Sequence, residues 1–142
     1  MFCHNFSKVL QDIIRIDRVS WLNLSKNRLG DTGVADLSKS IRRFNFLVHL
    51  DVSSNCISPK GFKSLGNAIS LNNSITELNV STLPCGSFKN RIDASSFFAA
   101  LEDPLSVLQC LNVAGTSLGV DGALAIFSAL ICKIDNLYVN SL

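Results

Sequence analysis

The stretch VSWLNLSKNRL, residues 19–29, decides the fold, because its pattern of apolar and polar positions returns along the chain. The pattern is apolar at its first, fourth, sixth and last positions and has Asn at the ninth. It returns as LVHLDVSSNCI, residues 47–57. A third copy begins at Ile75, after the same interval, a fourth at Leu108 and a fifth at Ile134. A pattern that returns at a fixed period indicates a repeat array.

The segment after each copy repeats as well, with apolar residues at offsets of three and four that share one face of a helix. These helix stripes are Val34, Leu37 and Ile41; Phe62, Leu65 and Ile69; after an insertion, Ala94, Phe97 and Leu101; and Ala123, Ile126 and Leu130. Phe6, Val9 and Ile13 are spaced as the helix of a preceding unit. Ser58 and Pro59 are the residue types expected at the N-cap and first position of a helix.

Each unit is therefore predicted to be a short strand, a turn and a helix. Alternation along the first strand points Leu22 and Leu24 inward and sends Trp21, Asn23 and Ser25 to the other side. One such unit cannot bury its apolar face alone, so the units are expected to stack on one another.

The Asn at positions 27 and 55 has an expected structural role. A carboxamide carries donors and an acceptor, so it can bond the backbone where the chain leaves the strand. Thr116 stands at this place in the fourth unit and can do part of the work, whereas Leu83 in the third unit cannot.

The 28-residue period, the L-x-x-L-x-L-x-x-N-x-L core and the helix starts at residues 29–33 (LGDTG) and 118–122 (LGVDG) resemble leucine-rich repeats of the ribonuclease-inhibitor type. The resemblance covers nearly the whole chain. It implies an α/β solenoid shaped as a curved horseshoe, with a parallel sheet on the concave face and helices on the convex face. The class includes nuclease inhibitors, activators of the Ran GTPase, innate immune receptors and actin-regulating scaffolds, and most members bind protein.

A single leucine-rich-repeat domain over residues 1–142, cut from a longer array, is the expected organisation. Its units are a partial repeat over 1–18, repeats over 19–46, 47–74, 75–107 and 108–133, and a partial repeat over 134–142. Neither end resembles a capping repeat, so self-association through the uncapped ends is expected.

The third unit is longer than the others, and most of its extra residues fall in 83–92. Insertions in repeat arrays map to loops, which often carry function. Phe88, Lys89 and Arg91 could form a binding loop there, or the segment could be a tolerated surface insertion.

Composition excludes several classes of function. The net charge of +2 is too small to indicate nucleic acid, and no run of 18 apolar residues predicts a membrane span. Residues 1–63 carry ten Lys and Arg against five Asp and Glu, whereas residues 64–142 carry three against six. This asymmetry could steer a partner with an acidic patch to the N-terminal half, or it could reflect ordinary solvated helix faces.

The cysteines number five, which is odd, and none forms a C-x-x-C motif. The N-terminus lacks the pattern of a secretory signal. Both features predict a reducing, cytoplasmic location.

The outward positions of successive strands predict columns of side chains on the concave face. The first column is Trp21, His49, Glu77, Cys110 and Asn136, and the second is Asn23, Asp51, Asn79, Asn112 and Tyr138. Aromatic residues within a polar field are a common composition of binding hot spots. The sequence therefore predicts that another protein binds at Trp21, Asn23, His49, Asp51, Glu77, Asn79, Asn112, Asn136 and Tyr138. The polar residues could equally be plain solvent-exposed groups of the repeat.

No catalytic, metal or cofactor site is predicted. His49 beside Glu77 and Asp51 could support acid–base chemistry, but the sheet offers no pocket there, and Cys110 lies two strands away. Cys3 and His4 match no zinc spacing. Two alternatives to a binding module stay open. One is a structural spacer in a larger scaffold. The other is a GTPase activator of the Ran-activator type, which would use the turn residues Lys26, Asn27, Arg28, Ser54, Asn55, Thr82 and Thr116.

Overall fold

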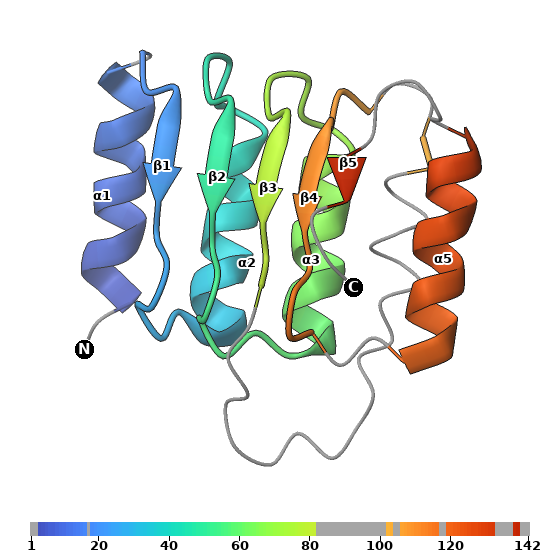
Figure 1. Ribbon diagram of the computed structural model, residues 1–142. Coiled ribbons are helices and arrows are strands. Elements are labelled where there is room, and N and C mark those ends of the chain that lie inside the picture. The colour runs from blue at the N-terminus through green and yellow to red at the C-terminus, as the bar shows by residue number, and fades with distance from the viewer. Residues whose placement is uncertain are drawn as a thin grey trace.

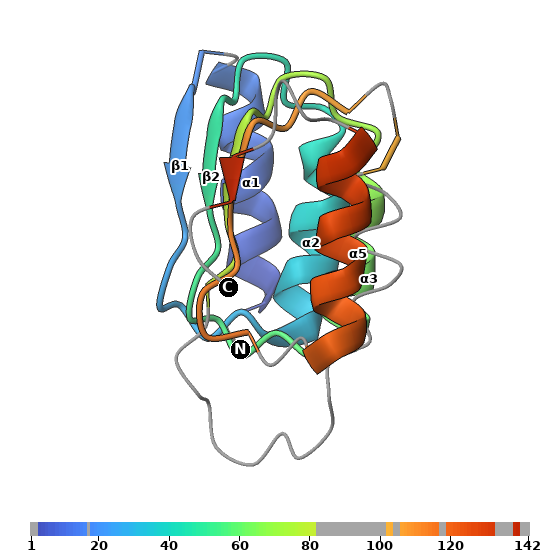
Figure 2. The same ribbon diagram turned by 45° about the vertical axis from the view of Figure 1, so that its right-hand side comes forward.

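The computed structural model describes residues 3–16, 18–81, 102–103, 106–116, 119–132 and 138–139. In chain order the elements are α1 (Cys3–Ile16), β1 (Trp21–Asn23), α2 (Gly30–Ile41), β2 (His49–Asp51), α3 (Pro59–Ile69), β3 (Glu77–Asn79), β4 (Cys110–Asn112), α5 (Gly119–Cys132) and β5 (Tyr138–Val139). They form two layers, with the described helices all on one side of the sheet (Figures 1 and 2). The chain thus has an α/β fold in which one face of the sheet, the open face, carries none of the described helices.

The sheet has five parallel strands that lie side by side in sequence order (Figure 1). Trp21 pairs with His49, His49 with Glu77, Glu77 with Cys110, and Cys110 with Tyr138. The predicted place of Tyr138 is therefore wrong by two positions. It stands in the column of Trp21, where Asn136 was expected, because Tyr138 follows Cys110 at the same interval as His49 follows Trp21. A shift of two positions leaves the alternation along the strand unchanged.

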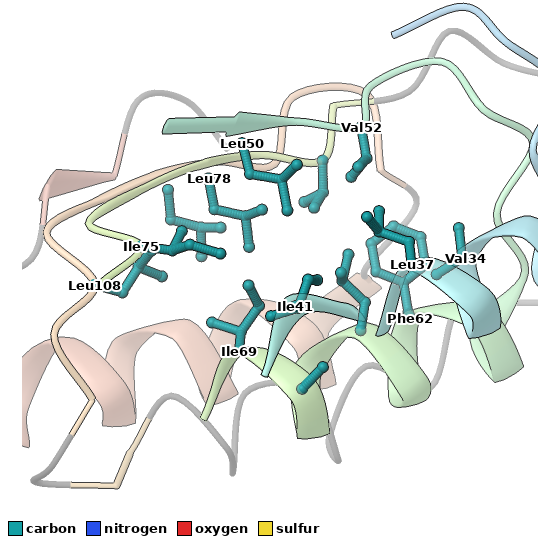
Figure 3. Close-up of a cluster of buried hydrophobic side chains, with 14 of the residues drawn as sticks. Val34, Leu37, Ile41, Leu50, Val52, Phe62, Ile69, Ile75, Leu78 and Leu108 are labelled. Carbon is teal, nitrogen blue, oxygen red and sulfur yellow. The ribbon is translucent and has the colours of Figure 1, made fainter. Parts of the chain in front are cut away.

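The middle residue of each of the first four strands points into the core, as predicted. These residues are Leu22, Leu50, Leu78 and Leu111, and all are buried. The helix stripes meet them from the other layer: Val34, Leu37, Ile41, Phe62, Leu65, Ile69 and Ile126 are buried as well. Figure 3 shows Leu50 and Leu78 pointing from the sheet toward Ile41 and Ile69 on the helices. One continuous apolar layer therefore holds sheet and helices together.

α1 departs from its predicted orientation. Phe6, Val9 and Ile13 were expected to form its buried stripe, but the fully buried side chain is that of Leu10. Val9 is 49% exposed, while Phe6 and Ile13 are partly buried against the core. The spacing allowed either choice, because residues 6, 10 and 13 lie on one helix face as readily as residues 6, 9 and 13.

The predicted role of the turn Asn is confirmed at Asn55, which is fully buried. Its Oδ1 accepts the backbone N–H groups of Asn27 and Leu29 at 2.9 and 3.2 Å, and its Nδ2 donates to the carbonyls of Leu24 and Val52 at 2.7 and 2.9 Å. One side chain thus ties two successive turns together. Thr116 does the predicted part of this work, since its hydroxyl donates only to the Val113 carbonyl.

Two residues in each of these turns have a left-handed backbone. Lys26 and Arg28 have φ of 61° and 52°, and Ser54 and Cys56 have φ of 54° and 56°. This conformation costs an L-residue about 1–2 kcal/mol. The bonds of Asn27 and Asn55, which stand between the left-handed residues, offset that cost.

The start of α3 is fixed by Ser58, Pro59 and Asp31. Ser58 is the N-cap and accepts the backbone N–H of Lys60, and Pro59 occupies the first turn, as predicted. Asp31, at the start of α2, accepts the backbone N–H of Ser58 at 2.9 Å and also accepts its hydroxyl. A Cβ on Gly61 would lie 2.6 Å from Oδ1 of Asp31, so only glycine fits there.

A second buried Asn, which the sequence did not reveal, stands at the opposite end of the units. Nδ2 of Asn72 donates to the carbonyls of Ile41 and Phe44 at 2.8 and 2.9 Å, and its Oδ1 accepts the N–H groups of Ser74 and Ile75. It joins the end of α2 to the segment after α3. The position could not be found from the repeat pattern, because Phe44 stands there one unit earlier.

Candidate functional site

Five residues, one from each strand, pair with one another in register across the sheet, and we call them the sheet-face row: Trp21, His49, Glu77, Cys110 and Tyr138. Trp21 is 58% exposed. The structure brings together four of the five residues predicted for the first column and replaces Asn136 with Tyr138. Asn136 lies outside the described residues.

Trp21, His49 and Glu77 are held against one another along this row. The rings of Trp21 and His49 stack with centroids 5.5 Å apart and planes 14° apart. Nδ1 of His49 lies 2.9 Å from Oε2 of Glu77. A carboxylate only accepts hydrogen bonds, so Nδ1 must be the nitrogen that carries the proton in this pair. The carboxylate orients the imidazole, and the imidazole supports one face of the indole ring.

Cys110 follows Glu77 on the next strand. Partial burial, and to a smaller extent the charge of Glu77, raises the pKa of the Cys110 thiol above its usual value. Cys110 is a partly buried residue of this row and is poorly suited to act as a thiolate nucleophile near neutral pH.

The second predicted column has a structural role in the described strands. At its first four positions a side-chain oxygen accepts the backbone N–H two residues further on, which is the geometry of an Asx turn. Asn23, Asp51, Asn79 and Asn112 accept in this way from Ser25, Ser53, Ser81 and Ala114, at 2.8, 2.8, 3.1 and 3.0 Å. Asn79 also donates from Nδ2 to Oδ2 of Asp51 at 3.1 Å. These four residues shape the strand ends, and the sheet-face row is the better candidate for recognition.

The arrangement of His49 and Cys110 does not support acid–base or nucleophilic catalysis. β3 stands between His49 and Cys110, so they are two strand spacings apart, roughly 10 Å. That distance is too long for a nucleophile and its base. Among the described residues, no group of three or more His, Cys, Asp or Glu could hold a metal ion.

Some of the turn residues that a GTPase activator would use form structural hydrogen bonds within the turns. Asn55 is buried in its bonds to two turns, and Nδ2 of Asn27 donates to the carbonyls of Leu24 and Ser25. Lys26 and Arg28 remain exposed. Thr82 lies outside the described residues, as do Phe88, Lys89 and Arg91 of the insertion.

Cys56 is disulfide-bonded. None of the helices in the described part of the chain is long and apolar enough to cross a membrane.

Comparisons with known proteins support the leucine-rich repeat. Residues 22–38 and 45–66 match the family model of the leucine-rich repeat. No curated protein matches the sequence. Among solved structures, the chain is similar to the one titled "Leiomodin-1 Actin-Binding Site 2 (ABS2)", with a TM-score of 0.74 and 17% sequence identity. The similarity covers 95% of this chain and 75% of that one, and at this identity it shows a shared fold.

Proposed function

We propose that this chain is a non-enzymatic protein-interaction module, built as a leucine-rich-repeat solenoid of 28-residue units of the ribonuclease-inhibitor type. The partner lies on the open, concave face of the sheet. The single observation that carries the proposal is the exposed Trp21, held in place by His49 and through it by Glu77.

The physical argument rests on exposure and rigidity together. An indole ring that is more than half exposed leaves apolar surface in water, and a partner that covers it gains binding free energy. Because the ring is already fixed by stacking, little conformational entropy is lost on binding. Rigid aromatic residues surrounded by polar groups are typical of binding hot spots.

Actin is the first partner to test, because the similar solved structure is named for an actin-binding site. The fold alone does not carry a partner from one protein to another, so the assay needs a variant of the sheet-face row. We would sediment actin filaments with the wild-type chain, with Trp21→Ala/His49→Ala, and with Phe46→Ala. Phe46 is 56% exposed and lies between α2 and β2, away from the row, so it is a matched control for the loss of an exposed ring.

Binding that is retained in Phe46→Ala and lost in the double variant would support both the face and the partner. If actin does not bind, the same three proteins are used as bait for a native extract, with the bound proteins quantified by mass spectrometry. A partner that depends on Trp21 and His49 supports the module. An identical set of proteins on all three baits would rule out the sheet face as the binding surface.

A further inference from the structure

An apolar cavity of about 210 Å³ lies between α1, the turn after β1 and the start of α2. Its apolar lining includes Phe6, Val9, Leu24 and Leu29, and Arg28 contributes to its polar side. Val9 and Arg28 are exposed, so the cavity is reached from solvent. It lies among the helices and turns and shares no residue with the sheet-face row.

A comparison of α1 with α2 explains why this space is empty. Val9 and Leu10 stand one repeat period before Leu37 and Ser38. In α2, Leu37 is fully buried. In α1, Leu10 is the fully buried residue and Val9 is half exposed. The deeply buried position therefore differs by one residue between the two helices, and Val9 is left at the solvent-facing wall of the cavity.

The size of the cavity suits one branched aliphatic side chain. An apolar cavity of about 150 Å³ is large enough to hold benzene, and this one is larger. Leu37 stands one repeat period after the cavity residue Val9 and is fully buried, so the next unit accommodates a leucine side chain at this position. Water in such a cavity has few hydrogen-bond partners, so the cavity is occupied more favourably by an apolar group.

The charges around the cavity indicate which residues should flank that apolar side chain in the partner. Arg28 lines it, and Lys26 is exposed on the same turn. The carboxylate of Asp31, at the start of α2, is already engaged with Ser58. Residues 1–63 carry ten Lys and Arg against five Asp and Glu, so the basic residues of the rim stand in a basic half of the chain. Carboxylates are the complementary groups.

We propose that this cavity is a second interaction site, which takes a leucine or isoleucine of a partner peptide that is flanked by acidic residues. The apolar side chain enters between Phe6, Val9, Leu24 and Leu29, and an adjacent carboxylate pairs with Arg28. The site is independent of the proposed binding on the sheet face, and either can exist without the other.

The test uses three blocked pentapeptides, EELEE, EEAEE and KKLKK, titrated into the ¹⁵N-labelled chain while amide shifts are followed by NMR. EELEE is expected to shift amides near residues 6–9 and 24–29. It should bind about tenfold or more tightly than EEAEE, since leucine buries more apolar surface than alanine. KKLKK should bind at least about threefold more weakly than EELEE, which is the size of one exposed charge interaction. Added salt should narrow the gap between the two charged peptides.

Two pairs of variants locate the site. Val9→Phe should fill the cavity and weaken EELEE about tenfold or more, whereas Ile16→Phe, at an exposed position near the end of the same helix, should not. Arg28→Asn should abolish the preference for acidic flanks, whereas Arg43→Asn, beyond the other end of α2, should keep it; Asn tolerates the left-handed backbone at position 28. Circular dichroism checks that each variant is folded.

Several results would overturn the proposal. Equal binding of EEAEE and EELEE rejects the apolar pocket, and equal binding of KKLKK rejects the acidic partner. An unchanged affinity in Val9→Phe places the peptide elsewhere on the surface. No amide shift with any peptide rejects the site altogether, and none of these results bears on Trp21 or His49.

Discussion

Asp31 and Ser58 are 27 residues apart in the chain, yet the carboxylate of Asp31 accepts both the backbone N–H and the hydroxyl of Ser58. Asp31 lies in the first turn of α2 and Ser58 caps α3, so one carboxylate sets the distance between two neighbouring helix starts. It lies so close that a Cβ on Gly61 would meet its Oδ1 at 2.6 Å. The helix starts of this chain are therefore coupled across units.

Replacement of Asp31 should reveal that coupling as a loss of stability. We expect Asp31→Ala to lower the free energy of unfolding by about 1.5–3 kcal/mol, the range for hydrogen bonds to a charged group. Asp36→Ala on the same helix removes only a pair with Lys39 one helical turn on, which contributes about 0.2–0.5 kcal/mol. Urea denaturation measures both. Equal effects of the two substitutions would contradict the assigned role of Asp31.

Asn27 and Asn55 occupy the same position of successive units, but their substitution should have different costs. Asn55 is fully buried, and its loss leaves the N–H groups of Asn27 and Leu29 without their acceptor. Each unsatisfied buried group costs about 1–3 kcal/mol, so Asn55→Ala should cost about 3 kcal/mol or more. Asn27 is exposed, and Asn27→Ala should cost about 1 kcal/mol. Urea denaturation of the two single variants is the measurement, and a larger cost at Asn27 would contradict this assignment.

The repeat pattern predicted the in-and-out order of the strands because that order follows from a period of two. It predicted that Asn55 bonds the backbone at the end of the strand because the same residue type recurs there in successive units, at positions 27 and 55. It could not find Asn72, whose counterpart one unit earlier is Phe44, so no periodic signal existed. It led to the wrong choice of Val9 over Leu10 in α1, because both residues continue an apolar helix stripe.

The candidate site was predictable in part for the same reason. The side chains of the sheet-face row and of the second column were both placed on the open face by alternation alone. Alternation carries no information on which oxygen accepts which N–H, so the Asx turns of Asn23, Asp51, Asn79 and Asn112 were missed. The stacking of Trp21 on His49 depends on the pairing of β1 with β2 in register, which only the structure supplies.

The leucine in the middle of β2 tests the core directly. Leu50 is fully buried, and Leu50→Ala should lower the free energy of unfolding by about 2–5 kcal/mol, as for other core leucines. Leu71→Ala is the matched control, because Leu71 is 61% exposed and its loss should change stability by less than about 0.5 kcal/mol. A cost below about 1 kcal/mol at Leu50 would contradict its inward orientation.

The left-handed turns offer a stabilising substitution. Lys26 has φ of 61°, and glycine adopts this conformation without the steric cost that a side chain incurs. Part of the gain is lost to the greater freedom of glycine in the unfolded chain, so Lys26→Gly should raise the free energy of unfolding by about 0.5–1 kcal/mol. Lys26→Ala removes the same charge and keeps the strain, and it should not stabilise the protein. If alanine stabilises as much as glycine, the gain comes from the charge and the strain argument fails.

The raised pKa of Cys110 predicts how its alkylation depends on pH. Only the thiolate reacts, and a raised pKa lowers the thiolate fraction at every pH below it. Iodoacetamide should therefore modify Cys110 more slowly than the cysteine of an unstructured, blocked peptide near pH 8, and the midpoint of the rate profile should lie at higher pH. Burial is the larger cause and Glu77 the smaller one, so Glu77→Gln should move the midpoint down only part of the way.

Asp12→Asn on α1 makes the same change of net charge far from Cys110 and should leave the profile in place. Mass spectrometry of the Cys110 peptide against time gives the rates. A midpoint unchanged by Glu77→Gln would show that burial alone raises the pKa.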